Sequence, residues 1–145
     1  HVRSRRQRQM CIRDRIFMNI SEVAKLVGLS SKQIRDYEKS GLLKPAQRSL
    51  SGYRHYEEKD LERLRFIRHS RDVGFSLQQI HQLLQLQDNP NRSSREVKAL
   101  TTQHIKTLNE QIHHLQKMVE ELERWHNACQ GNDCPECSIL EGLKG

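Results

Sequence analysis

The chain has 145 residues, of which 34% are hydrophobic and 30% charged, so it has room for one small domain with an extension and buries only a modest core. No run approaches the roughly 18 uninterrupted apolar residues that a membrane-spanning helix needs, so we expect no membrane span. The net charge of +7 is unevenly spread: residues 1–86 are basic and residues 87–145 are mildly acidic, which suits a nucleic-acid-binding head followed by a regulatory tail.

Residues 1–17 are not expected to belong to the fold. They carry six arginines against one aspartate, and they show no periodicity, no capping pattern and no apolar stretch typical of a signal peptide. We interpret them as a non-native or disordered extension, with Met18 as the natural start. The alternative is a basic arm that adds non-specific phosphate contacts.

Two short helices joined by a tight turn are predicted after the extension. Ser21 is expected to cap the first helix, which Gly28 closes. The second helix begins at Ser30 or Ser31 and is ended by Gly41. Two short helices with a glycine in the turn between them are typical of a helix-turn-helix.

A β-hairpin, or wing, is predicted over residues 42–56, where a proline and a glycine interrupt short β-like segments. Two further helices follow it. The first is expected over residues 57–73. The second begins with a capping box formed by Ser76 and Gln79 and ends near Leu86.

A long helix is predicted over residues 93–127. Its apolar residues recur at spacings of three, four, three, four and three, and they are Ile105, Leu108, Ile112, Leu115, Val119 and Leu122. This pattern predicts the seam of a two-stranded coiled coil. A second copy of the helix is the natural partner, because no other element remains to cover the seam; the alternative is a helix packed on the core of its own domain.

Side chains suited to DNA gather in the second helix and in the wing. They are Lys32, Gln33, Arg35 and Tyr37 in the helix, and Arg48, Tyr53 and Arg54 in the wing. Arginine and glutamine can read base edges, while lysine and tyrosine mainly hold phosphates. Any one of them could be a solvated surface residue. Together, in a helix-turn-helix followed by a basic aromatic wing, they predict a DNA interface.

Three of the four cysteines lie within nine residues of the tail, at Cys129, Cys134 and Cys137. Thiolates select soft metals such as copper(I), zinc or iron–sulfur clusters. Zinc would need four ligands, which His126 could complete, whereas a [2Fe–2S] cluster would need a fourth cysteine and only Cys11 remains. Copper(I) is satisfied by two thiolates in a linear arrangement. The spacing alone does not choose among these metals, and surface thiols without function are a further alternative.

Three strings in the first half, MNISEVAKLVGLSSKQIRDYEKSGLL, SGYRHY and RDVGFSLQQI, resemble the MerR family of metal-responsive activators, and the match looks closest to its copper-efflux regulators. The resemblance covers residues 18–143. It implies promoter contacts by Lys32, Arg35, Tyr37, Arg48, Tyr53 and Arg54. It also implies that Cys129 and Cys137 are the two thiolates that hold Cu(I) or Ag(I), with Zn(II) as the alternative.

Three more positions bear on the metal through this resemblance. Ser94 lies where members that sense divalent metals carry a third ligating cysteine. Lys98 lies where a lysine offsets the negative charge of a dithiolate–copper(I) centre. Both favour a monovalent ion. Cys134 has no counterpart in the usual two-cysteine loop; it is either a spectator or a third ligand that widens the response to mercury, cadmium or zinc.

We therefore predict an all-α protein with a small β wing. It consists of a winged helix-turn-helix head, a long antiparallel coiled-coil dimerisation helix and a C-terminal metal-binding loop. The expected boundaries are 1–17 for the extension, 18–87 for the head, 88–127 for the dimerisation helix and 128–145 for the cysteine loop and tail.

The predicted function is that of a cytoplasmic homodimer that binds double-stranded promoter DNA and has no membrane association. With RNA polymerase, it activates metal-efflux or detoxification promoters by distorting the DNA. No phosphate-binding loop, nucleophile motif or carboxylate pair is recognisable, so we expect no enzyme. The alternatives are a sensor of zinc, cadmium or mercury, an iron–sulfur redox sensor on the same scaffold, a zinc-stabilised structural protein and a sensor of organic ligands.

Overall fold

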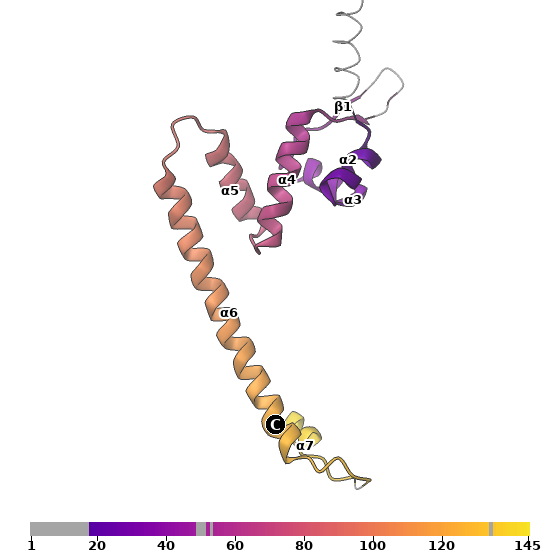
Figure 1. The fold of residues 1–145 in the computed structure, drawn as a ribbon, viewed down its shortest axis with the longest axis vertical. Helices are drawn as coiled ribbons and strands as arrows, with labels where there is room; N and C mark the ends of the chain where they lie inside the picture. Colours follow the sequence, from indigo (N-terminus) through magenta and orange to yellow (C-terminus); the bar gives the residue numbers. More distant parts are fainter. Residues whose placement is uncertain (1–17, 49–51, 53, 134) are drawn as a thin grey trace, which may run out of the picture. The chain divides into compact units, whose positions relative to one another are not determined.

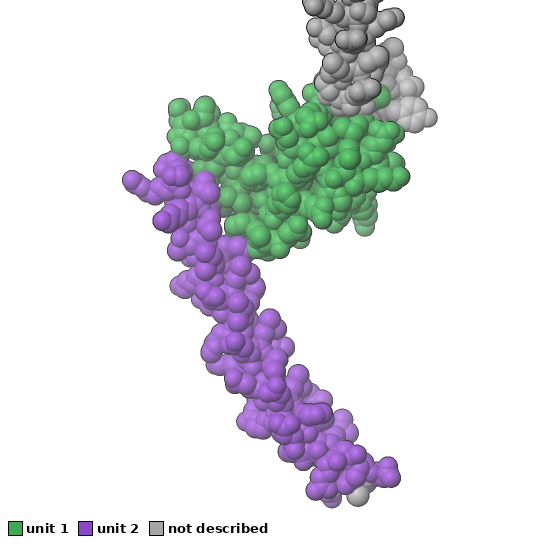
Figure 2. Space-filling model, viewed as in Figure 1, with its two compact units in different colours: residues 1–92 green, residues 93–145 purple. Residues whose placement is uncertain are grey.

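The computed structural model describes residues 18–48, 52, 54–133 and 135–145. In these residues the chain is helical apart from one short antiparallel strand pair, as the predicted all-α class with a small wing requires (Figure 1). The elements are α2 (Ile20–Val27), α3 (Ser31–Lys39), β1 (Gln47–Arg48), β2 (Arg54–His55), α4 (Glu58–Asp72), α5 (Leu77–Asp88), α6 (Ser94–Ala128) and α7 (Ser138–Lys144). They fall into two compact units, His1–Arg92 and Ser93–Gly145 (Figure 2).

The first unit begins with the predicted helix-turn-helix, although its first cap differs from the prediction. Asn19 caps α2, because its Oδ1 accepts a hydrogen bond from the N–H of Glu22 at 2.9 Å. The prediction of Ser21 as the cap is therefore wrong by two residues, and Ser21 lies inside the helix. The helix ends at Gly28, whose φ of 69° is left-handed as a glycine C-cap allows.

The start of α3 is fixed by a capping box. Ser30 Oγ accepts from the N–H of Gln33 at 3.1 Å, and Gln33 Oε1 accepts from the N–H of Ser30 at 2.9 Å. Of the two serines considered for this start, Ser30 is thus the cap. The same device begins α5, where Ser76 and Gln79 form the predicted capping box. These reciprocal bonds satisfy N–H groups that the first turn of a helix leaves unpaired.

One hydrophobic core joins the elements of this unit. Its buried members are Val23, Val27, Ile34, Tyr37, Leu42, Leu43, Tyr56, Leu61, Leu64, Ile67, Ile80 and Leu84. Tyr56 is the largest fully buried side chain, and its hydroxyl donates to Glu38 Oε1 at 2.5 Å. Its backbone also pairs with that of Met18, with N–O distances of 2.8 and 3.0 Å. Tyr56 thereby joins the base of the wing to α3.

The wing consists of β1 and β2, with Gln47 opposite His55 and Arg48 opposite Arg54. Residues 49–51 and 53, which connect the strands, lie outside the described residues. Beyond the wing, α4 keeps to the predicted range: Glu57 and Val73 are its caps, and the helix lies between them. The next helix, α5, extends to Asp88, two residues past the predicted end.

The second unit is a helical hairpin. Helix α6 begins after its cap Ser93 and runs for 35 residues, and α7 lies beside its last turns (Figure 1). Five residues of the predicted seam have exposed fractions of 51–56%, and they are Ile105, Ile112, Leu115, Val119 and Leu122. We call the six seam residues the apolar stripe. No helix in the described part of the chain is long and apolar enough to cross a membrane.

An arginine from α4 holds the end of α2. Arg68 Nη1 donates to the carbonyl oxygen of Val27 at 2.8 Å, and this approach passes directly over Gly28. A Cβ on Gly28 would lie 2.1 Å from Arg68 Nη1. A side chain here would therefore both strain the left-handed backbone and displace the guanidinium.

Replacing Gly28 by alanine is expected to destabilise the head by more than the ~1–2 kcal/mol that a left-handed residue costs, because the Arg68–Val27 hydrogen bond is lost as well. Gly41 is the matched control, since its φ is 81° and the nearest atom to its Cβ position is 3.9 Å away. Urea unfolding of Gly28→Ala and Gly41→Ala measures the difference. Equal losses of unfolding free energy in the two variants would contradict a stabilising role of the Arg68–Val27 hydrogen bond.

Candidate metal centre and nucleic-acid interface

Two thiols meet where α6 ends and α7 begins. Cys129 is the C-cap of α6 and Cys137 is the N-cap of α7. Their sulfur atoms lie 3.8 Å apart. Both cysteines are half-buried, and both carry free thiols. The sequence prediction paired these two cysteines, and the structure places them together.

The local sequence explains how the chain turns between them. The N–H of Cys129 donates to the carbonyl oxygens of Trp125 and His126, which ends the helix. Gly131 has a φ of 64°, a left-handed conformation that glycine adopts without strain. α7 then returns along the last turns of α6, so the chain between the two cysteines forms a short loop closed at its base by the sulfur pair.

The environment of Cys137 favours its thiolate. The backbone N–H of Leu140 has the largest effect and lowers the pKa of the Cys137 thiol below its ordinary value. Partial burial acts in the opposite direction, the N–H of Ile139 and the thiol of Cys129 lower the pKa further, and the charge of Glu141 raises it. The net direction is downward, and the thiolate is the form that binds metals.

The spacing of the two sulfur atoms fits a shared metal ion. With metal–thiolate bonds of about 2.3 Å, two sulfur ligands stand about 3.8 Å apart at a tetrahedral angle and about 4.6 Å apart in a linear arrangement. The 3.8 Å separation of Cys129 and Cys137 matches the first value and is within about 1 Å of the second. A thiophilic ion of either geometry can therefore be held with little movement of α7.

A larger ligand set is not assembled in the described residues. Among them, no group of three or more His, Cys, Asp or Glu side chains is placed to hold a metal ion. His126, considered for a four-ligand zinc site, is exposed in the last turn of α6. Cys134, considered as a third ligand, lies outside the described residues, as does Cys11.

The two positions expected to tune the site lie at the other end of α6. Ser94 is the first residue of that helix and Lys98 is one turn further, and both are exposed. At 1.5 Å per residue, about 50 Å of helix separates Ser94 from Cys129. One protomer therefore does not bring Ser94 or Lys98 to its own cysteine pair.

The predicted DNA-contacting residues divide into three groups. Lys32 and Arg35, with Gln33 beside them, are exposed on α3, and Arg48 is exposed on β1. Tyr37 is only 7% exposed and belongs to the core, so its ring supports α3. Tyr53 lies outside the described residues, and for Arg54 the structure describes the backbone pairing in β2.

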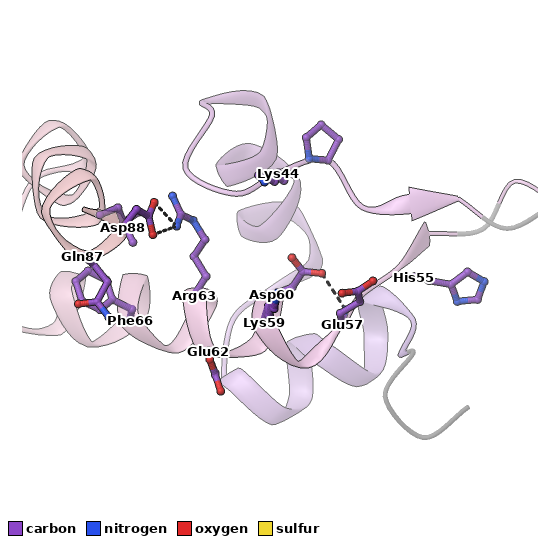
Figure 3. A pocket seen from close by; sticks show the side chains of 12 residues that line it. Lys44, His55, Glu57, Lys59, Asp60, Glu62, Arg63, Phe66, Gln87 and Asp88 are labelled. Atoms are coloured by element: carbon purple, nitrogen blue, oxygen red, sulfur yellow. Dashed lines mark hydrogen bonds and ion pairs between the residues drawn. The ribbon is translucent and has the colours of Figure 1, made fainter. Parts of the chain in front are cut away.

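The first unit also contains a cavity of about 560 Å³ between the base of the wing, α4 and α5 (Figure 3). Its rim carries both signs of charge, from Lys44 and Lys59 to Glu57 and Asp60. Arg63 crosses it: Nε donates to the carbonyl oxygen of Leu42 at 2.6 Å, and Nη1 pairs with Asp88 at 3.1 Å. Because Arg63 connects the turn after α3 to the end of α5, we assign this cavity a structural role.

Sequence reasoning missed Trp125 and Gly142, which pack against each other where α7 meets α6. A signal was available, because the only tryptophan of the chain lies one helical turn before Cys129 on the same helix face. Their contact is taken up below.

Iodoacetamide is expected to modify Cys137 with a midpoint at lower pH in the folded protein than in the urea-unfolded chain, because the folded-state pKa is lowered. By linkage, this shift stabilises the folded state above the unfolded thiol pKa, and the contribution is lost as the pH falls through the folded pKa. Mass spectrometry of proteolytic fragments measures the extent of modification at Cys137. Equal midpoints in the two states would contradict the lowered pKa.

Comparisons with known proteins agree with the geometry of both units. The family model described as MerR HTH family regulatory protein matches residues 18–87, and the model described as MerR, DNA binding matches residues 61–125. A protein of Haemophilus influenzae named "Probable heavy metal-dependent transcriptional regulator" is 76% identical over 128 residues, which are 88% of this chain and 100% of the relative.

Two further comparisons are informative. The transcriptional regulator CueR of Escherichia coli is 43% identical over 128 residues, covering 88% of this chain and 95% of CueR. The crystal structure of the regulator PbrR691 from Ralstonia metallidurans, in complex with lead(II), superposes with a TM-score of 0.75 at 36% identity, covering 87% of this chain and 98% of that one.

These matches confirm the resemblance on which the sequence prediction relied, and the described helices reproduce the fold of such regulators. The chain therefore belongs to the MerR family of helix-turn-helix transcription regulators, and it is a DNA-binding regulator rather than an enzyme.

Proposed function

We propose that this regulator responds to a soft metal ion bound by Cys129 and Cys137, and that the ion is monovalent copper or silver. The carrying observation is the sulfur pair, 3.8 Å apart at the closed base of a loop. Relatives named for heavy-metal dependence, and a neighbour crystallised with lead(II), support metal sensing in general. The choice of a monovalent ion rests on charge.

The charge argument concerns the completed centre. Two thiolates with copper(I) carry a net charge of −1, whereas two thiolates with a divalent ion are neutral. A lysine beside the sulfur pair therefore favours the monovalent ion by attraction to the net negative centre. A serine in place of a third thiol acts in the same direction, because it withholds a ligand that a divalent ion would use.

A second copy of the chain can bring Lys98 to the cysteines. The spacings of the apolar stripe are the same in either direction, so the stripe is symmetric about the point between His113 and His114. Two copies that bury their stripes against each other in antiparallel orientation therefore share this midpoint. Lys98 and Cys129 lie equally far from it, which sets Lys98 level with Cys129 of the partner subunit.

This dimer gives the regulator two heads for the two halves of a symmetric promoter. Exposed Lys32 and Arg35 on α3, with Arg48 on the wing, supply charge for phosphates and donors for base edges. Metal activates transcription only if it binds the conformation that distorts the promoter more tightly than the other conformation. RNA polymerase then engages the distorted promoter, and the reducing cytoplasm keeps the thiols free.

Anaerobic titration of the reduced protein against copper(I) and zinc chelators is expected to show one copper(I) per protomer, two sulfur neighbours by X-ray absorption, and weaker binding of zinc. Cys129→Ser or Cys137→Ser should lower copper affinity by more than about a hundredfold, since even changes around metal ligands cost ten- to a hundredfold. Cys134→Ser and Cys11→Ser are matched controls and should change little. Tight zinc binding with three sulfur neighbours would overturn the monovalent assignment and place Cys134 in the site.

Lys98→Gln is expected to lower copper(I) affinity by about tenfold and to leave zinc affinity nearly unchanged, because only the copper(I) centre carries net charge. The copper effect should shrink as ionic strength rises. Lys106→Gln, which removes the same charge from an exposed position of α6, is the control. Equal losses for both metals would show that Lys98 acts on folding or assembly instead.

A further inference from the structure

The contact between Trp125 and Gly142 is unusually close. A Cβ built on Gly142 would lie 2.3–2.5 Å from three atoms of the Trp125 indole, Cε2, Nε1 and Cδ2. Atoms that are not bonded to each other do not approach so closely, so no residue other than glycine fits while the ring stays in place. The indole therefore lies directly against the backbone of α7.

Backbone conformation does not explain why residue 142 is glycine. Gly142 lies inside α7, and it is not among the described glycines that have positive φ. A glycine within a helix weakens it, because its unfolded backbone has more freedom to lose. At this position, close packing against Trp125 is the property that only glycine supplies.

The short helix depends on such a contact. Isolated helices of seven residues are not stable in water, so packing must hold α7 in place. The large apolar side chains Leu140 and Leu143 contribute little to that packing, since they are 58% and 64% exposed, whereas Ile139 is half-buried. The half-buried Trp125 is therefore a main surface on which α7 rests.

The contact lies next to the sulfur pair. Trp125 precedes Cys129 by one helical turn, and the N–H of Cys129 donates to the Trp125 carbonyl oxygen at 3.1 Å. Cys137 is the residue from which α7 begins. The position of α7 on the indole thus determines where the sulfur of Cys137 lies relative to that of Cys129.

We propose that Trp125 and Gly142 form a positioning contact that holds α7 against α6 before metal arrives and so preorganises the Cys129–Cys137 pair. This inference rests on the proposed function, in which the pair binds the metal. Preorganisation raises affinity because the loop is already ordered, so that binding does not have to supply the free energy of ordering it. Neither residue touches the metal in this proposal; both act through the position of Cys137.

Alanine at position 142 tests the contact, because the two possible roles of Gly142 predict opposite signs. If α7 made no close contact there, Gly142→Ala would strengthen the helix by about fivefold in its equilibrium constant and would leave or improve metal affinity. The positioning contact predicts the reverse: copper(I) affinity falls by about tenfold or more. In the reduced, metal-free protein, Trp125 emission also becomes more accessible to acrylamide.

A compensating change separates positioning from general damage. Trp125→Leu makes room for a methyl group, so Trp125→Leu with Gly142→Ala should bind copper(I) at least as tightly as Trp125→Leu alone. Lys144→Ala, on an exposed residue of the same helix, is the control and should change neither affinity nor Trp125 quenching. Circular dichroism of each variant confirms that α6 is intact.

The outcomes distinguish this inference from the function on which it rests. Copper(I) affinities that are equal in the wild type and Gly142→Ala would overturn the positioning contact and leave the proposed function standing. A loss of copper(I) affinity in Gly142→Ala that Trp125→Leu does not relieve would also overturn the positioning contact. Failure of the wild type itself to bind copper(I) would overturn the proposed function, and the wild type is measured first.

Discussion

The apolar stripe on α6 is the constraint on which the arrangement of the regulator depends. Five of its six side chains are more than half exposed in one protomer. Within the described second unit, only α7 packs on α6, and it contacts the last turns. A helix that is polar on its other face gains most of its stability by burying such a stripe. In the antiparallel dimer proposed above, the pairing that buries the stripe also sets Lys98 level with Cys129 of the partner subunit, so that one sequence pattern would govern both assembly and the charge at the sulfur pair.

Much of the fold was predictable because its signals are local. Serine and glutamine three residues apart identified the start of α5, two adjacent serines placed the start of α3 to within one residue, and the glycine after α2 identified its end. The long helix predicted over residues 93–127 agrees with α6 to within one residue at each end. The pairing of Cys129 with Cys137 came from the family resemblance, and the 3.8 Å separation agrees with it. These features depend on residues that are near one another in the chain.

Features that depend on tertiary packing were harder to predict. Tyr37 was predicted to contact DNA from its residue type and from the family resemblance. Its place in the core was not predicted, although it lies three residues after Ile34 on the buried face of α3, a spacing that indicates burial. Helix α7 was not predicted, since residues 128–145 were expected to form only the cysteine loop and tail; its seven residues include a glycine and have little helical tendency of their own. In the proposed contact, α7 rests on Trp125, and the one sequence signal of that contact is the position of the tryptophan one helical turn before Cys129.

The sulfur separation connects the positioning of α7 with the response to metal. At 3.8 Å the pair is already spaced for a tetrahedral angle, whereas a linear copper(I) centre needs about 4.6 Å. Opening the pair to the linear spacing therefore needs a shift of somewhat under about 1 Å between the two sulfur atoms, which side-chain rotation or a small movement of α7 supplies. In the proposed function, the indole on which α7 rests keeps Cys137 close to Cys129, so that the pair needs little rearrangement to bind an ion of either geometry.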